Sequence, residues 1–301
     1  MILLLVVALL TALLLASCKA SAPTPEGPTM PADTRTPRPT FTLVATETSQ
    51  PTATLAPTLT PGPPTVTPLP TASPTPTTDP RLNPLTGLPV DDQAMLERRV
   101  LAARIGNDPA ARPQDGLGLA EIVYEEIMDG WTLTRFTALY LASDVQRIRP
   151  IRSARLSTLQ IVPQYDAAAV HSGASDHIRW LIAQAGFVDL DEYYHGAPYA
   201  VLDGHDWRSR MYTSVQSLHD HLIAKNLERG KLEMGYRFDA AAPTAGQPAT
   251  AIHIPYPQLC VVDWAWDAAS GRYLRTMQGT PHVEGLTGAQ IGAENVIVFY
   301  A

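Results

Sequence analysis

The sequence predicts an α/β fold, a mixed sheet with flanking helices, followed by a smaller β-rich C-terminal unit and preceded by a disordered N-terminal tether. Short apolar runs such as 100–105, which Gly106 follows, predict buried strands. The amphipathic run 176–185 predicts a helix. Proline and threonine dominate 19–80, which predicts no core there. The chain therefore divides into a lipoprotein signal at 1–18, a Pro/Thr-rich linker at 19–80, an α/β domain at 82–235 and a β-rich domain at 236–301.

The N-terminus reads MILLLVVALLTALLLASC. Its apolar run is shorter than the ~20 residues that a membrane-spanning helix needs. The ending Leu15-Ala16-Ser17-Cys18 resembles a bacterial lipobox, which implies that Cys18 becomes the lipidated N-terminus after cleavage. No Lys or Arg precedes the run, and a short membrane anchor is the alternative. Either reading places the rest of the chain on the extracytoplasmic face of the bacterial cell membrane. In the lipobox reading the membrane is a partner through the lipid on Cys18.

The linker and the overall charge limit the classes of function. A Pro/Thr-rich segment cannot bury enough apolar surface to offset its ordering entropy, and it favours extended polyproline-type conformations. The formal net charge of the chain is −7, which disfavours nucleic acid as a partner. With Cys18 assigned to lipid, Cys260 has no partner for a disulfide, and we expect it to be a buried thiol.

The α/β domain is expected to contain a strand, a strand pair, a helix, a strand and two further helices. The strand pair turns at Asp129-Gly130, and the last helix opens with the capping-box pattern Thr213-x-x-Gln216. The predicted ranges are 100–105, 121–128, 134–141, 153–162, 167–171, 176–185 and 213–227.

The β-rich domain is expected to contain strands at 251–255 and 261–266, and the turn 267–271 then leads into a hairpin partner at Tyr273-Leu274. A last apolar strand is predicted at 295–300. The chain stops there without a closing turn, which leaves open that the reading frame is truncated.

Several stretches together resemble one bacterial family, the YerB-like lipoproteins, which form a domain-of-unknown-function family with N-terminal and C-terminal parts. The resemblance implies a fold and a location but no agreed reaction. This chain has Arg149 where the family usually has glycine before its Pro-x-Arg-Ser-Ala-Arg run. The matching residues are 83–87, 107–108, 111–114, 116–117, 122–125, 134–136, 150–155, 165–167, 170–171, 212–214, 281–282, 287–288 and 295–296.

Four arginines stand in the stretch RIRPIRSAR, residues 147–155. Arg152 and Arg155 are three residues apart, so on a helix that starts near Pro150 they would share a face and an anion-attracting N-terminus. Ser153 adds a hydroxyl donor. Guanidinium groups in this arrangement suit a carboxylate or phosphate. The alternative is internal pairing with carboxylates, for which Glu121, Glu125, Glu126 and Asp129 are available.

Arg147 and Arg149 precede the proline and fall outside the family pattern, and we expect them to be solvated or rim charges. Glu125 lies in the middle of a strand and would need a partner if buried, and Arg135 on the neighbouring strand is a candidate for that role.

Further candidate ligand-binding residues are Arg112, Arg135, His171 and Ser172, which with Arg152, Ser153 and Arg155 complete the predicted site. His171 and Asp108 each follow a predicted buried strand, where sites of α/β proteins collect. A hydrolase would use His171 as base and Asp108 to orient it. No nucleophile motif accompanies them, and a hydrogen-bonded structural histidine is the alternative.

No metal and no cofactor is predicted. The histidines lack zinc-type spacing with partners, and the sequence has no Walker loop and no dinucleotide fingerprint. Trp264, Trp266 and Tyr273 form an aromatic hairpin face, which indicates either core packing or a surface for stacking glycans.

The function that we predict is that of a tethered cell-envelope lipoprotein that binds an anionic cell-wall ligand, such as a cell-wall polymer, or an envelope protein partner. A metal-independent hydrolase or transferase that acts on an envelope substrate is one alternative. A purely structural scaffold is the other. The sequence leaves open whether the chain is an enzyme.

Overall fold

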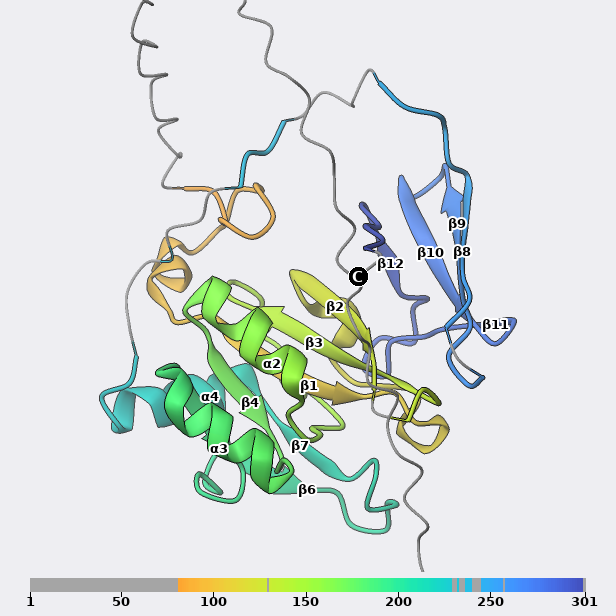
Figure 1. The fold of residues 1–301 in the computed structure, drawn as a ribbon. Coiled ribbons are helices and arrows are strands. Elements are labelled where there is room, and N and C mark those ends of the chain that lie inside the picture. Colours follow the sequence, from red (N-terminus) through yellow and green to blue (C-terminus); the bar gives the residue numbers. More distant parts are fainter. Residues whose placement is uncertain are drawn as a thin grey trace, which may run out of the picture. The chain divides into compact units, whose positions relative to one another are not determined.

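Two sheets organise the protein in the computed structural model (Figure 1). The structure describes residues 81–128, 130–228, 232, 236–239, 245–256 and 258–299. All of these residues fall within one compact unit of the chain. The predictions for the signal, the linker and Asp129 lie outside the described residues.

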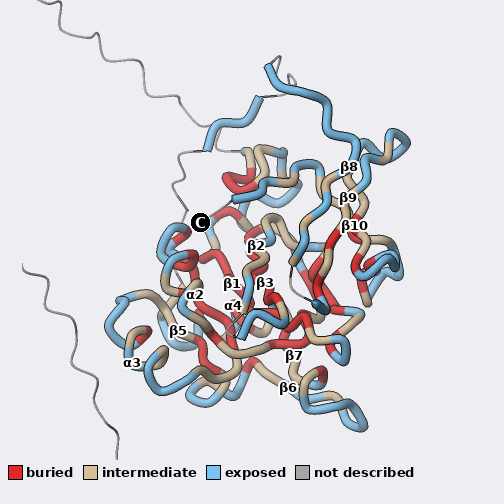
Figure 2. The backbone as a smooth tube through the Cα atoms, turned by 45° about the vertical axis from the view of Figure 1, so that its right-hand side comes forward, coloured by how far each residue is buried: buried red, intermediate tan, exposed pale blue. Residues whose placement is uncertain are grey.

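The first sheet is mixed and has the strand order β2-β3-β1-β4-β5. Strand β1 pairs antiparallel with β3 and parallel with β4, and β4 pairs parallel with β5. The strands are β1 (Leu101–Gly106), β2 (Ile122–Ile127), β3 (Thr134–Tyr140), β4 (Ala168–His171) and β5 (Val188–Asp191). All residues of β1, β3 and β4 are buried, as Figure 2 shows.

Helices cover both faces of this sheet. On one face, Ile161 of α2 (Leu156–Ile161) packs in a cluster with Ala102, Leu139 and Ala169. Helix α3 (Asp176–Ala185) lies beside α2. On the other face, α4 (Val215–Ala224) packs its apolar side against the cluster that contains Ala103 and Phe136. A two-stranded sheet, β6 (Tyr199–Val201) with β7 (Met211–Thr213), connects α3 and β5 to α4.

The second sheet is antiparallel and has the order β11-β10-β9-β8, with β12 also paired to β10. Its strands are β8 (Ala251–Ile254), β9 (Val262–Asp267), β10 (Arg272–Met277), β11 (Thr280–Pro281) and β12 (Gly292–Ala293). Short 3-10 helices complete the described part: η1 (Gln93–Glu97), η2 (Pro109–Ala111), η3 (Leu117–Leu119) and η4 (Val162–Tyr165). The predicted fold class, a mixed α/β sheet with helices and a smaller β-rich unit, is confirmed.

Three predicted elements differ in the structure. The helix expected at 153–162 begins only at Leu156, because the backbone of 150–154 bonds to strands instead. The last helix is capped by Ser214, whose side chain accepts from the Ser217 N–H, and Thr213 belongs to β7. Residues 295–299 form no strand, and Phe299 is 80% exposed, because an apolar run does not by itself supply a sheet edge to pair with.

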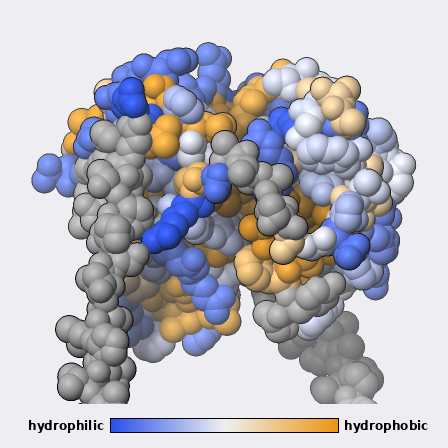
Figure 3. All heavy atoms as spheres, turned by 90° about the horizontal axis from the view of Figure 1, so that it is seen from above, coloured by the Kyte–Doolittle hydropathy of each residue, from blue (hydrophilic) through white to orange (hydrophobic). Residues whose placement is uncertain are grey.

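Apolar side chains are visible at several places on the surface. On the face seen in Figure 3, hydrophobic residues show in several groups between hydrophilic ones. Among the large apolar side chains, Trp180 and Trp207 are 60% and 64% exposed. Because exposed apolar atoms are ordinary on a protein surface, exposure alone does not mark a site here. No helix in the described part of the chain is long and apolar enough to span a membrane.

Candidate anion-binding site

Four arginines gather at the end of β1, on the sheet face that α2 covers. We call Arg104, Arg135, Arg152 and Arg155 the arginine cluster. Side chains alternate along a strand, so Ala103 and Ile105 enter the core beneath α4 while Arg104 faces the other way. The prediction from sequence did not include Arg104, although a single charge within an otherwise apolar run was a signal for it.

Arg104 is fully buried and only partly hydrogen-bonded. Its Nη1 atom donates to the Glu126 carboxylate and to the Thr137 hydroxyl. Among the described residues, no acceptor lies within hydrogen-bonding distance of its Nε and Nη2 atoms. Burial lowers the pKa of Arg104, and the carboxylate of Glu126 opposes that shift. The side chain therefore carries donors that no described residue satisfies.

Arg135 lies across from Gly106 in the β1–β3 register and is 2% exposed. Its Nη1 atom donates to the carbonyl oxygen of Ser153 at 3.0 Å, while its Nε atom finds no acceptor among the described residues. Burial, together with the guanidinium groups of Arg155, Arg104 and Arg152, lowers the pKa of Arg135 to about 9. The direction of this shift indicates that Arg135 is buried close to three other positively charged side chains.

Arg152 lies on an extended segment and not on a helix. Its backbone N–H donates to the Arg104 carbonyl, and its own carbonyl accepts from the Ser172 N–H at 3.1 Å. Its side chain crosses Gly106 so closely that a Cβ added there would lie 2.7 Å from its Cγ. The predicted reason for placing Arg152 and Arg155 together, a shared helix face, is therefore wrong. A strand-like segment between β1 and β4 brings Arg152 to the cluster, and Arg155 follows it as the N-cap of α2.

Two carboxylates accompany the four guanidinium groups. Glu126 pairs with Arg104 and accepts from the Ser157 hydroxyl at 3.0 Å. Asp108 raises the pKa of Arg135 and Arg152 against the larger effect of burial. One oxygen of each carboxylate, Glu126 Oε2 and Asp108 Oδ2, is buried without a donor from the described residues. The cluster thus has twice as many cationic groups as anionic ones, with unused donors and unused acceptors in the same place.

His171 and Ser172 belong to a neighbouring group and do not join the cluster through their side chains. The buried His171 ring contacts Asp189 Oδ1 through Nε2 at 2.6 Å and the Gly173 carbonyl through Nδ1 at 3.0 Å. The Ser172 hydroxyl donates to Glu192 at 3.3 Å. Both ring nitrogens of His171 are engaged and its carboxylate partner is Asp189, so the structure does not pair His171 with Asp108 as a catalytic base would require.

Arg112 lies in a different place, where the two sheets meet. It donates to Asn107, to the carbonyl oxygen of Leu259 at 2.8 Å and to the sulfur of Cys260 at 3.6 Å. The buried Cys260 sulfur also accepts from the Thr134 N–H at 3.3 Å, which agrees with the predicted burial of this thiol. Arg112 therefore joins the two sheets and is separate from Arg152 and Arg155.

Glu125 continues this junction toward the second sheet. Its carboxylate pairs with Arg275 at 2.9 Å, so the partner predicted for Glu125, Arg135, is wrong. The two residues lie on opposite faces, since it is Glu126 that stands opposite Arg135 in the register. Arg275 Nε donates to His282 Nδ1 at 2.9 Å, and His282 Nε2 donates to Gln114 at 2.7 Å.

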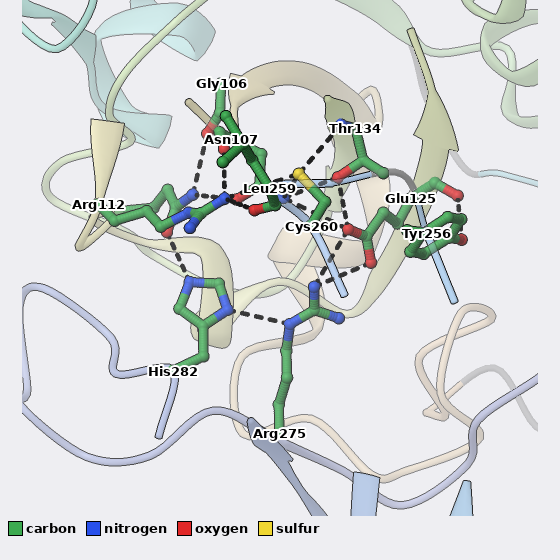
Figure 4. Close-up of polar contacts among 11 residues, drawn as sticks. Gly106, Asn107, Arg112, Glu125, Thr134, Tyr256, Leu259, Cys260, Arg275 and His282 are labelled. Atoms are coloured by element: carbon green, nitrogen blue, oxygen red, sulfur yellow. Dashed lines mark hydrogen bonds and ion pairs between the residues drawn. The ribbon is translucent and has the colours of Figure 1, made fainter. Parts of the chain in front are cut away.

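Figure 4 shows these contacts as a continuous chain of polar groups. We call it the junction network, and it comprises Asn107, Arg112, Gln114, Glu125, Cys260, Arg275 and His282. Burial, followed by the charges of Arg275 and Arg112, lowers the pKa of His282 to about 3. His282 is therefore a neutral imidazole that links two partners.

Arg147 and Arg149 were expected to face solvent, and for Arg149 this is wrong. Arg149 is 9% exposed, and its Nε atom lies 2.7 Å from Asp115 Oδ2. Arg147 is partly exposed and reaches the same carboxylate at 2.5 Å. Arg149 is buried because it pairs with the buried carboxylate of Asp115. Neither Arg147 nor Arg149 joins the arginine cluster.

No group of three or more His, Cys, Asp or Glu side chains in the described ranges is arranged to hold a metal ion. Trp264 and Trp266 lie on the same face of β9, opposite Arg275 and Tyr273 of β10, but they differ in burial. Trp264 packs against the core and under Arg275, while Trp266 is 42% exposed and contacts Tyr273.

The fold and the site define a class of protein: an α/β domain with a buried arginine cluster, joined by a polar network to a small antiparallel sheet. Two family models match the chain, the N-terminal domain of a protein of unknown function (DUF3048) at residues 85–228 and its C-terminal domain at residues 252–301. The chain therefore belongs to the DUF3048 family, and the predicted resemblance to YerB-like proteins is confirmed.

The chain is similar to a curated relative from Bacillus subtilis (strain 168), which carries the name "Putative lipoprotein YerB". The two are 27% identical over an alignment of 229 positions that covers 72% of this chain and 66% of the relative. This chain thus spans just under two thirds of the length of that relative. The crystal structure of YerB from Bacillus subtilis shares the fold, with a TM-score of 0.63 and 24% identity over 70% of this chain and 71% of that one.

Proposed function

We propose that this chain is a lipid-anchored protein on the extracytoplasmic face of the cell membrane and that its arginine cluster binds an anionic cell-wall ligand. The observation that carries the proposal is the state of Arg104 and Arg135. Both are almost completely buried, yet both keep N–H groups for which the described residues offer no acceptor.

Burial of cations without partners is costly in a folded protein. A buried charge is ordinarily paired, and a donor left without an acceptor costs about 1–3 kcal/mol. Within the cluster, four guanidinium groups face the carboxylates of Glu126 and Asp108. A bound oxyanion would supply acceptors and negative charge together. Phosphate and carboxylate match the planar fork of arginine, which makes them the ligand groups that this site suits.

The location rests on the N-terminus and on the relative. The ending Leu15-Ala16-Ser17-Cys18 fits lipidation of Cys18, and the Bacillus subtilis relative is named as a lipoprotein. A Pro/Thr-rich linker of ~60 residues would reach about 190 Å if fully extended in a polyproline conformation. That reach would let the binding domain meet wall material well away from the membrane surface.

Phosphate-dependent thermal stability tests the binding proposal. The full chain should melt at a higher temperature in inorganic phosphate than in sodium chloride of equal ionic strength, because a ligand that binds only the folded state stabilises it. Arg152→Met should abolish this shift. Arg210→Met is the matched control, because Arg210 is an exposed arginine on β6–β7, and it should keep the shift. Equal melting in the two salts, or an equal shift in all three proteins, would count against the proposal.

Mass spectrometry of the mature protein tests the anchor. A diacyl or triacyl modification on Cys18 as the first residue is expected, and Cys18→Ser should release the chain from the membrane fraction. A mature chain that retains Leu15, or one cleaved far beyond Cys18 without lipid, would contradict the anchor and would leave the binding proposal untouched.

A further inference from the structure

The hairpin that joins β6 to β7 places an aromatic ring against the arginine cluster. The ring of Trp207 lies 4.8 Å from the guanidinium carbon of Arg152, and the ring is largely exposed. Arg208 lies 5.9 Å from the same ring and pairs with Asp206 at 2.9 Å. Trp207 therefore stands at the boundary between the cluster and solvent.

Contact with the Trp207 ring holds Arg152 without using a hydrogen-bond acceptor, so its donors remain available. A guanidinium group that lies over a ring uses its face, whereas its N–H groups point outward in the plane of the group. In agreement with this geometry, the Nε atom of Arg152 has no acceptor among the described residues. Trp207 is thus a positioning residue, since it fixes Arg152 without occupying the donors that an oxyanion needs.

An unsatisfied acceptor beside the cluster adds a second requirement. Asp108 is close enough to act on the charge of Arg135, Arg152 and Arg208, and its Oδ2 atom is buried without a donor from the described residues. A carboxylate ion has no hydrogen to donate to this oxygen, and inorganic phosphate can donate only through its own P–OH group. A ligand that also carries hydroxyl groups can satisfy Asp108 while its anionic group meets the arginines.

We infer that the ligand is an oxyanion carried on a sugar ring, with the hydroxyl groups directed to Asp108 and the ring against the exposed part of Trp207. This inference rests on the proposed function, because it names the ligand class of the same site. Sugar rings present C–H groups that pack on aromatic faces, and their hydroxyls are donors as well as acceptors. The β6–β7 hairpin would then select the ligand, and the buried arginines would hold its charge.

Calorimetric titration with three probes tests the inference. Inorganic phosphate, glycerol 3-phosphate and glucose 1-phosphate carry a similar charged group, but only the last has a ring. We expect glucose 1-phosphate to bind the full chain about tenfold more tightly than glycerol 3-phosphate. Trp207→Ala should remove that difference, Trp207→Phe should keep most of it, and Trp180→Ala should keep all of it, since Trp180 is an equally exposed tryptophan on α3.

The outcomes separate the two proposals. Equal affinity for glucose 1-phosphate and glycerol 3-phosphate, with clear binding of both, would overturn the sugar assignment and leave the anion site standing. A preference for glucose 1-phosphate that survives in Trp207→Ala would overturn the role of Trp207. Absence of binding for all three probes would overturn the anion site itself.

Discussion

The backbone N–H of Arg152 donates to the carbonyl oxygen of Arg104 at 2.8 Å, so two arginines 48 positions apart in sequence are fixed by one sheet contact. The same residue accepts from Ser172, which places 150–154 between the ends of β1 and β4. The cluster is therefore held by backbone bonds, and its side chains need not stabilise one another. This arrangement lets the charged groups be changed one at a time.

Arg135→Met should not destabilise the protein in phosphate-free buffer. The change removes a crowded charge that donates to the Ser153 carbonyl and keeps the volume of the side chain. Replacement of poorly compensated buried charges by apolar residues is often neutral or stabilising. Arg275→Met is the contrast, since Arg275 pairs with Glu125 and His282, and its loss should cost about 3–5 kcal/mol. Urea unfolding measures both, and a loss of that size for Arg135→Met would make the cluster structural.

Asp108→Asn should distinguish two effects of the Asp108 carboxylate on ligand binding, its negative charge and its capacity to accept a hydrogen bond. With one carboxylate fewer beside the arginines, inorganic phosphate should bind more tightly, because repulsion between like charges falls. Glucose 1-phosphate should gain less, because the amide accepts a hydroxyl proton less strongly than a carboxylate does. Calorimetric titration of wild type and Asp108→Asn with both ligands measures how much the affinity for each ligand changes. An equal gain for both would show that Asp108 contacts no hydroxyl group.

Asp115→Asn should destabilise the fold by about 3–5 kcal/mol. Asp115 is 2% exposed and holds Arg147 and Arg149, so its loss leaves Arg149 buried without its carboxylate. The control is Asp206→Asn, which removes an exposed ion pair with Arg208 and should leave the unfolding midpoint unchanged. Similar midpoints for the two variants would mean that Arg149 finds other acceptors.

Stability should fall as the pH is lowered from about 6.5 toward 3 because of His282. Its folded pKa is about 3, and the ordinary value for histidine is 6.5, so within this window the unfolded chain binds a proton that the folded chain does not. This one group contributes a slope of up to ~1.4 kcal/mol per pH unit, with its full stabilisation present above the unfolded pKa.

Urea unfolding at several pH values measures this slope. The slope of His282→Gln should be shallower than that of the wild type, and His205→Gln, at an exposed histidine, should match the wild type. Parallel curves for wild type and His282→Gln would contradict the assignment.

Local patterns predicted much of the fold. The strand pair of β2 and β3 and the helix α3 follow from residue periodicity and turn residues within a few positions, and these lie where the sequence placed them. The strand-like path of 150–154 could not be read in this way, because its hydrogen-bond partners are near residues 104 and 172. The stretch Pro150-Ile151-Arg152-Ser153-Ala154 fits a helix start equally well.

The candidate site was predicted in part for a similar reason. Arg135, Arg152 and Arg155 do lie together, while Arg112 and His171 belong to other groups, and whether the cluster binds a ligand stays a prediction. Arg104 was missed because a charge inside a buried strand contradicts the apolar pattern that identifies the strand. Partners from distant parts of the chain, such as Arg275 for Glu125, cannot be assigned from sequence spacing.

Glu284 makes one contact of the α/β domain depend on residues that are synthesised late. Its carboxylate accepts from the N–H groups of Gly116 at 2.6 Å and Gly118 at 2.7 Å, although Gly116 precedes it by 168 positions. Translation at about 5–20 residues per second would separate these two ends by roughly 10–30 seconds. During that interval the α/β domain is attached to the ribosome, and the N–H groups of its loop at 116–118 lack the Glu284 carboxylate that will accept from them. A nascent chain of this kind is a natural substrate for chaperones.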